Sequence, residues 1–172
     1  MSTTGKIDQA IYTLLDDLMT KDRDATEGYL KAAENIKERS AREMLLRYSN
    51  QRGRFVAGLK EEINRLGGDF ADRSSLLSSM HRIWMDIQGT ISGKDSQTIL
   101  SECLRGEEAA LKDYQEASEN NFLPKKTKEL IQHHIEKIES SIKELNDWLN
   151  DNSDNNQTTM KVEDMPVEII AK

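Results

Sequence analysis

A short pattern that occurs twice in this chain constrains its fold more than any other feature. Asp22 is followed seven residues later by Tyr29, and Glu107 is followed seven residues later by Tyr114. In both copies the Tyr precedes an Ala-small-Glu-Asn run, and the two copies lie 85 residues apart without a gap. The repeat predicts two related helical hairpins that pack together as one bundle.

The amino-acid composition favours a single helical domain. The chain has 172 residues with only two prolines and nine glycines, and its net charge of −7 is spread over interspersed acidic and basic residues. It lacks the clustered basic face of nucleic-acid-binding proteins and any apolar run near the roughly 20 residues that span a bilayer. Cys103 is the only cysteine, which excludes an intrachain disulfide and a Cys-based zinc site. We expect a cytoplasmic protein that binds neither nucleic acid nor membranes.

Apolar residues recur at spacings of three and four along four long segments, which predicts four helices. The predicted helices cover residues 7–37, 40–66, 97–120 and 124–149. Ser40 and Glu43 have the spacing of a capping box, Gly67-Gly68 ends the second helix, and Asp95 or Ser96 caps the third. The long connection predicts a crossover helix over 75–91. The fold class is therefore all-α, an up-down-down-up four-helix bundle with a helical crossover and ferritin-like topology.

The end of the chain differs in composition from the rest. Residues 150–159 are rich in Asn, Asp, Ser, Thr and Gln and are predicted to form an unstructured linker. Residues 160–172 regain apolar side chains, either as a frayed end or as a docking segment for a partner or another subunit. We thus divide the chain into a bundle, 1–149, and a polar linker with a C-terminal tail, 150–172. We expect a homo-oligomer or a protein partner.

Three polar residues interrupt the apolar stripes near the middle of their helices. They are Asp22, Gln51 and Glu107, and mid-helix positions of a bundle share one level of the core. Glu139 and His134 flank the stripe of the last helix. Buried carboxylates need compensation. One explanation is a pair of metal ions held by carboxylates and Glu-x-x-His motifs. The other is a salt-bridged layer in which Arg52 or Arg54 supplies the positive charge.

The stretch Glu102-Cys103-Leu104-Arg105-Gly106-Glu107-Glu108-Ala109-Ala110, with Tyr114, resembles the signature helix of a family of uncharacterised bacterial ferritin-like proteins. The segment Met80-His81-Arg82-Ile83-Trp84 and the Gly67-Gly68 pair also match it. The resemblance covers about residues 7–149. It implies a ferritin-like bundle without an assigned activity and an association with stress or stationary-phase physiology.

Residue by residue, the resemblance implies a degraded metal site. Asp22 and Glu107 match the carboxylates of the first and third helices. Gln51 to Arg54 and Glu136 to Glu139 stand where Glu-x-x-His is required, and neither contains a histidine. We therefore expect a structural or interaction protein with no cofactor and no catalytic residues. The alternative is a di-iron type protein of iron handling or peroxide chemistry, with iron or manganese bound by Asp22, Gln51, Glu107 and Glu139.

Overall fold

The computed structural model describes residues 3–68 and 94–163, and the side chains of 9–68 and 94–152. The described residues form four α-helices and no strand. The helices are α1 (Thr3–Asn35), α2 (Arg39–Arg65), α4 (Ser96–Ser118) and α5 (Lys125–Glu163). The crossover helix that the sequence predicts over 75–91 lies outside the described residues.

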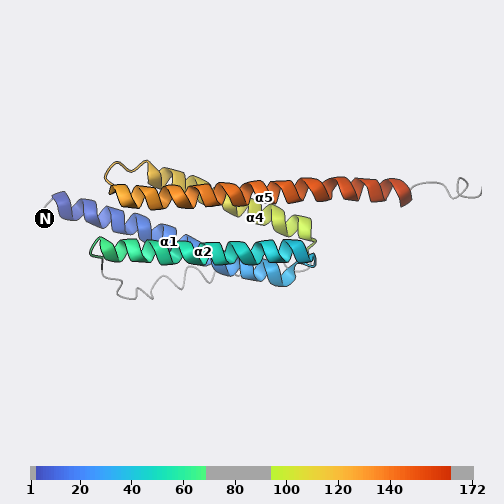
Figure 1. Ribbon diagram of the computed structural model, residues 1–172, viewed down its shortest axis with the longest axis horizontal. Coiled ribbons are helices and arrows are strands. Elements are labelled where there is room, and N and C mark those ends of the chain that lie inside the picture. Colours follow the sequence, from blue (N-terminus) through green and yellow to red (C-terminus); the bar gives the residue numbers. More distant parts are fainter. Residues whose placement is uncertain (1–2, 69–93, 164–172) are drawn as a thin grey trace, which may run out of the picture.

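The four helices form an elongated bundle of two antiparallel pairs (Figure 1). α1 packs mainly against α2, and α4 packs mainly against α5. α1 and α5 run in one direction along the bundle and α2 and α4 in the other, so the predicted up-down-down-up order is confirmed. α5 extends past the end of the other three helices. None of the described helices is both long and apolar enough to cross a membrane.

α2 ends just before the predicted pair of glycines, Gly67 and Gly68. Gly67 has φ 83°, a left-handed conformation that favours glycine, and its N–H donates to the Asn64 carbonyl at 3.0 Å. The N–H of Gly68 donates to the Ile63 carbonyl at 3.0 Å. A Cβ on Gly68 would lie 2.8 Å from Ile63 Cγ2, so this position also has no room for a side chain.

The predicted capping box at the start of α2 is wrong. The helix begins at Arg39, so Ser40 already lies inside it and cannot act as its N-cap. The Glu43 carboxylate instead accepts a hydrogen bond from Arg39 Nε at 2.8 Å. Glu38 occupies the N-cap position without a capping hydrogen bond, and its carboxylate accepts a hydrogen bond from Ser96 Oγ at the start of α4.

The start of α4 agrees with the sequence prediction. Asp95 is the N-cap, and its Oδ1 accepts a hydrogen bond from the Thr98 N–H at 2.8 Å. This contact satisfies one of the free donors in the first helical turn. Pro124 directly precedes α5, and its carbonyl accepts a hydrogen bond from the Lys128 N–H at 3.0 Å.

The prediction of an unstructured linker over residues 150–159 is wrong, because α5 continues as a helix to Glu163. The segment between Lys125 and Glu163 contains no Gly or Pro, so nothing in it forces the helix to end. Asn, Asp and Ser are weak helix formers but do not break a helix that has already started. The division into domains at 149 stays a prediction.

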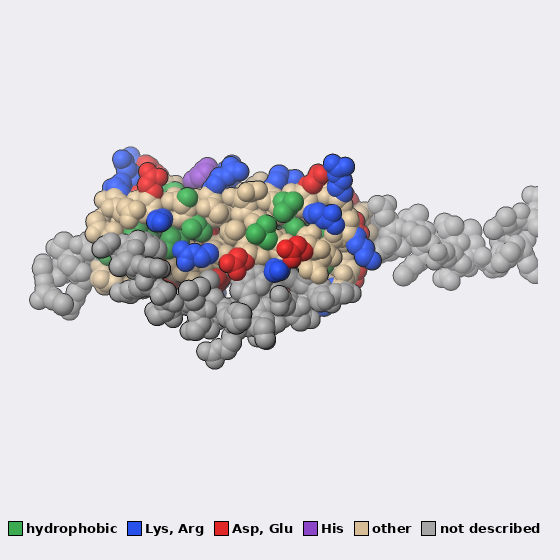
Figure 2. All heavy atoms as spheres, turned by 90° about the horizontal axis from the view of Figure 1, so that it is seen from below, with side chains coloured by type: hydrophobic (Ala, Val, Ile, Leu, Met, Phe, Trp, Pro, Cys, Tyr) green, Lys and Arg blue, Asp and Glu red, His purple; other side chains and the backbone are tan. Residues whose placement is uncertain are grey.

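The core consists of two apolar clusters, one on each side of a polar layer. The first cluster includes Leu15, Leu18, Phe55, Leu59, Ile131 and Ile135, and the second includes Ala32, Ile36, Leu45, Ile99, Leu100 and Leu145. On α1, α2 and α4 the buried charged residues Asp22, Arg52 and Glu107 lie between members of the two clusters. On the face drawn in Figure 2, the acidic and basic side chains of the described residues are interspersed.

Candidate functional site

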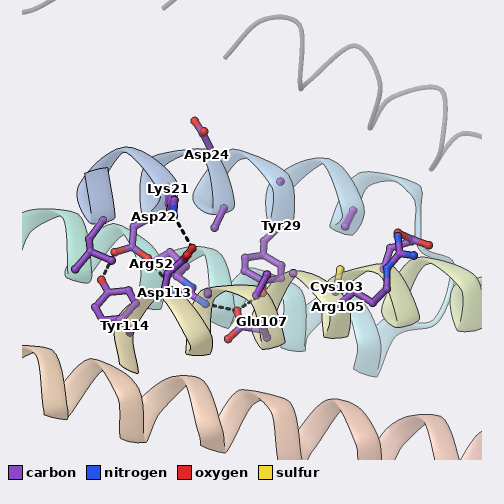
Figure 3. A pocket seen from close by; sticks show the side chains of 18 residues that line it. Lys21, Asp22, Asp24, Tyr29, Arg52, Cys103, Arg105, Glu107, Asp113 and Tyr114 are labelled. Atoms are coloured by element: carbon purple, nitrogen blue, oxygen red, sulfur yellow. Dashed lines mark hydrogen bonds and ion pairs between the residues drawn. The ribbon is translucent and has the colours of Figure 1, made fainter. Parts of the chain in front are cut away.

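Three charged side chains meet in the polar layer between the two apolar clusters (Figure 3). Arg52 Nη1 of α2 lies 2.8 Å from Asp22 Oδ1 of α1, and Arg52 Nη2 lies 2.7 Å from Glu107 Oε1 of α4. The side chains of Arg52 and Asp22 are 1% exposed, and that of Glu107 is 0% exposed. One guanidinium therefore bridges two carboxylates inside the bundle, in the forked geometry that suits arginine.

The two tyrosines of the repeat complete this network crosswise. The hydroxyl of Tyr29, from the first copy, donates to Glu107 Oε1, the acid of the second copy. The hydroxyl of Tyr114, from the second copy, donates to Asp22 Oδ2, the acid of the first. Both rings are buried. Each half of the chain thus supplies the hydrogen-bond donor for the acid of the other half.

α5 contributes a buried histidine to one side of the network. His134 Nδ1 lies 3.1 Å from the Tyr114 hydroxyl. Because the Tyr114 hydrogen points to Asp22, the histidine completes a hydrogen bond when its own hydrogen is on Nδ1. Its ring stacks on Phe55, with centroids 3.8 Å apart, and Phe55 lies beneath the Arg52 guanidinium at 5.4 Å. Aromatic packing therefore holds both the cation and the histidine in place.

Burial is the largest single influence on the pKa of each of Asp22, His134 and Arg52. It raises the pKa of Asp22 to about 6, although the Arg52 charge and the Tyr114 hydroxyl act in the opposite direction. Burial also lowers the pKa of His134 to about 3, so its imidazole is neutral. For Arg52, the carboxylates of Glu107 and Asp22 outweigh burial and raise the guanidinium pKa above its usual value. The arginine is a permanent cation.

Two polar atoms of the network have no hydrogen-bond partner among the described residues. They are Glu107 Oε2 and Arg52 Nε. With both acids ionised, the three groups also carry one net negative charge. Unpaired polar atoms in a protein interior are uncommon and call for a physical explanation.

A cavity of about 580 Å³ adjoins the network between α1 and α4 (Figure 3). Its wall includes all five members of the network described above: Asp22, Tyr29, Arg52, Glu107 and Tyr114. The other described residues of the wall are mostly small or apolar, among them Leu18, Ala25, Gly28, Cys103, Gly106 and Ala110. Burial raises the pKa of the Cys103 thiol to about 12, so it is not a reactive thiolate at neutral pH.

The structure brings together two of the four residues predicted to bind metal. Asp22 and Glu107 share one guanidinium, as described above. Gln51 is half-buried, and its Nε2 donates to Ser141 Oγ at 3.1 Å and to the Lys137 carbonyl at 3.4 Å. Glu139 is exposed on α5 and lies outside the buried layer.

The sequence pattern predicts that Gln51 interrupts the α2 stripe, and this prediction is wrong by one residue. The side chain that enters the core is Arg52, whereas Gln51 lies at the edge of the layer. Both positions fit an apolar spacing of three and four between Tyr48 and Phe55. Of the two arginines considered as the compensating charge, Arg52 is buried and Arg54 is exposed.

These residues do not fit the metal pair that the repeat first suggests. In the described part of the chain, no group of three or more His, Cys, Asp or Glu side chains is placed to hold an ion. The cation between the two carboxylates is a guanidinium, which would repel a metal ion at that position. Whether any of the four candidates binds a metal stays a prediction.

The tyrosines were part of the repeat but were not predicted as members of the site. Their identical spacing after each acid was the available signal. That signal shows a relation between the copies but not which acid each hydroxyl reaches, because this depends on how α1 and α4 lie against each other.

Comparisons with known proteins agree with the fold. The up-down-down-up bundle has the ferritin-like fold. The chain belongs to the family described as Domain of unknown function (DUF2383), which matches residues 10–120. The structure is also similar to that of a dodecameric thioferritin, the bacterioferritin-related protein from Bacteroides fragilis. The TM-score is 0.72 with 15% sequence identity, over 88% of this chain and 90% of that one. No curated protein matches the chain.

Proposed function

We propose that this protein is a non-enzymatic ferritin-like bundle in which the ion network is a structural element. The observation that carries the proposal is the position of Arg52, with one nitrogen on Asp22 and one on Glu107. A permanent cation between the two acids supplies the charge that a metal would otherwise supply. In this account the site holds the four helices in register and performs no chemistry.

The network is suited to this structural role because it connects both halves of the chain. Arg52 belongs to the first hairpin and Glu107 to the second, so the ion pair joins α2 to α4. Tyr29 and Tyr114 link α1 and α4 in both directions. A slip of one helix along its neighbour would leave at least one buried charge without its partner, which costs several kcal/mol.

We also propose that the protein acts as a homo-oligomer. The support is its similarity in fold to the thioferritin from Bacteroides fragilis, which is a dodecamer. Sedimentation-velocity analysis of the full chain tests this, with a species larger than one 19.6 kDa chain expected. A single monomeric species at micromolar concentration would contradict it. The association with stress physiology stays an expectation from the family resemblance.

Substitution of the two arginines tests the structural role of Arg52. Arg52→Met leaves two buried carboxylates without a cation and should lower the free energy of unfolding by about 3–5 kcal/mol. Arg54→Met, two positions along the same helix on the exposed side, should change it by no more than about 0.5 kcal/mol. Urea denaturation compares them. Equal effects of the two substitutions would refute a structural role for the network.

One observation favours the second candidate function, a metal-binding protein of di-iron type that holds iron or manganese. Glu107 Oε2 has no hydrogen-bond partner among the described residues, so one carboxylate oxygen remains for a cation. This candidate requires Arg52 to leave both carboxylates. In that case Arg52→Met should increase metal binding and leave the fold intact.

A further inference from the structure

The cavity between α1 and α4 has the size of a small-molecule site. Its volume of about 580 Å³ falls within the range of about 300–1,000 Å³ that is usual for such sites. Small residues face it from both helices: Ala25, Gly28 and Ala32 of α1, and Gly106, Ala109 and Ala110 of α4. A Cβ on Gly106 would meet no atom within 4 Å, so the space beside this helix is open.

A buried hydrogen-bond acceptor lies in the wall of this cavity. Glu107 is 0% exposed, and its Oε2 has no hydrogen-bond partner among the described residues. Its other oxygen already accepts hydrogen bonds from Arg52 and Tyr29. Because Oε2 is closed to solvent, a donor that enters from the cavity reaches it once the side chains that cover it shift, and then removes the cost of the unpaired atom.

The charges in the cavity wall favour a positively charged ligand over a negatively charged one. Among the described residues, the wall contains five acidic side chains, namely Asp22, Asp24, Glu102, Glu107 and Asp113, and three basic side chains, namely Lys21, Arg52 and Arg105. Each of the three basic residues already has an acidic partner. Lys21 pairs with Asp113 at 2.7 Å, Arg105 pairs with Glu102, and Arg52 holds its two carboxylates. An anion would meet an excess of negative charge, whereas a cation would be attracted.

We propose that this cavity binds a small organic amine in its protonated form. The ammonium group donates to Glu107, and its charge offsets the net negative charge of the network. The apolar body of the amine lies between the small residues of α1 and α4, where it buries apolar surface. This role is separate from the structural role of the network, because the ligand uses the oxygen that Arg52 leaves free.

Three compounds with the same phenyl skeleton test the proposal on the full chain. They are 2-phenylethylamine, 2-phenylethanol and phenylacetate, which are cationic, neutral and anionic at pH 7. In ¹H–¹⁵N NMR titrations, the amine should shift the amide signals of Gly28 and Gly106. It should bind at least about tenfold more tightly than the alcohol, because both groups can donate to the Glu107 carboxylate but only the ammonium adds a charge–charge attraction. Phenylacetate should bind most weakly of the three.

A matched pair of glycine substitutions separates the cavity from the rest of the surface. At both Gly106 and Gly53 an added Cβ meets no atom within 4 Å, but only Gly106 lines the cavity. Gly106→Phe should therefore reduce amine binding at least tenfold, and Gly53→Phe should leave it unchanged. Should Gly106→Phe lose helical circular dichroism, Ala109→Phe replaces it, because Ala109 lines the same cavity and is exposed.

Three results would overturn the proposal. The first is the absence of amine binding to the wild-type chain at millimolar concentration. The second is binding of phenylacetate as tight as that of the amine. The third is equal amine affinity in the two glycine variants. None of these results bears on the stability difference between Arg52→Met and Arg54→Met, so the structural role of the network stands or falls separately.

Discussion

Tyr29 and Glu107 belong to different copies of the internal repeat, and the hydroxyl of the first donates a hydrogen bond to the carboxylate of the second. Tyr114 and Asp22 form the reciprocal contact. Each acid of the repeat therefore accepts a hydrogen bond from the tyrosine of the other copy, and both contacts run between α1 and α4. Arg52 lies between the two contacts, whereas Lys137, its equivalent at the offset of 85 residues, is exposed on α5.

The reciprocal contacts predict similar losses when either tyrosine is replaced. Tyr29→Phe and Tyr114→Phe each remove a hydrogen bond to a buried carboxylate and should lower the free energy of unfolding by about 1.5–3 kcal/mol. Tyr12→Phe is the control, because the Tyr12 hydroxyl donates to a neutral acceptor, the Leu66 carbonyl. Its loss should be nearer 1 kcal/mol. Urea denaturation measures all three. Network variants no less stable than Tyr12→Phe would contradict the account.

Replacement of the whole network should be tolerated better than replacement of one member. Glu107→Leu alone removes the buried acceptor of Arg52 Nη2 and of the Tyr29 hydroxyl, and should cost about 1–3 kcal/mol for each donor left unsatisfied. The combined change of Asp22→Leu, Arg52→Met and Glu107→Leu removes all three charges and should recover most of that loss, because apolar packing replaces a costly ion pair. Thermal unfolding of both variants provides the comparison. A single variant as stable as wild type would show that the ion pair is not structural.

The buried His134 should contribute a pH dependence to stability. Its pKa of about 3 in the folded chain lies below the ordinary value of 6.5, so between these values the unfolded chain binds more protons than the folded chain. The free energy of unfolding from this group therefore rises with pH from about 3 to 6.5. His134→Gln should flatten the rise. NMR titration of the ring checks the pKa directly, and titration of this imidazole near pH 6.5 would disprove the assignment.

Asp22 should act with the opposite sign in an overlapping range of pH. Burial raises its pKa from 3.8 to about 6, so the folded chain binds more protons between these values. The contribution of Asp22 to stability is complete below about pH 3.8 and declines as the pH rises to about 6. Asp22→Asn should therefore make stability rise more steeply with pH across this range than in wild type. An unchanged slope would place the Asp22 pKa near its ordinary value.

The part of α5 beyond Asn152 should contribute little to the free energy of unfolding of the bundle. In the part of the chain whose side chains are described, the apolar clusters reach no further than Leu149. A chain that ends at Asn152 should therefore retain its free energy of unfolding within about 0.5 kcal/mol. Sedimentation of the same truncated chain tests whether the tail is a docking segment. A large loss of stability would place the tail within the folded domain.

The sequence predicted the fold well because the relevant signals are local. The apolar spacing placed the helices, and the glycines at 67 and 68 ended α2 where the structure ends it. Helix ends were less accurate. Ser40 has the residue type and spacing of a capping box, but the helix starts one residue earlier, at Arg39. The composition of residues 150–159 indicated a linker, although nothing there stops a helix that has already formed.

The candidate site was predictable only in part. Asp22 and Glu107 were found because a charged residue in an apolar stripe is conspicuous. Arg52 was not distinguished from Arg54, because an arginine beside a stripe can extend into solvent or turn its long stem inward. The crossed tyrosine contacts depend on how α1 lies against α4. No local pattern encodes this relation.

The most direct test of the central claim is the metal content of the full chain, purified without a histidine tag or chelator and then incubated with ferrous iron under anaerobic conditions. Because Arg52 occupies the place between Asp22 and Glu107, we predict far less than one ion per chain by elemental mass spectrometry, in the wild type and in Glu107→Ala alike. One or two ions per chain in the wild type, lost in Glu107→Ala, would contradict the account and establish these carboxylates as metal ligands.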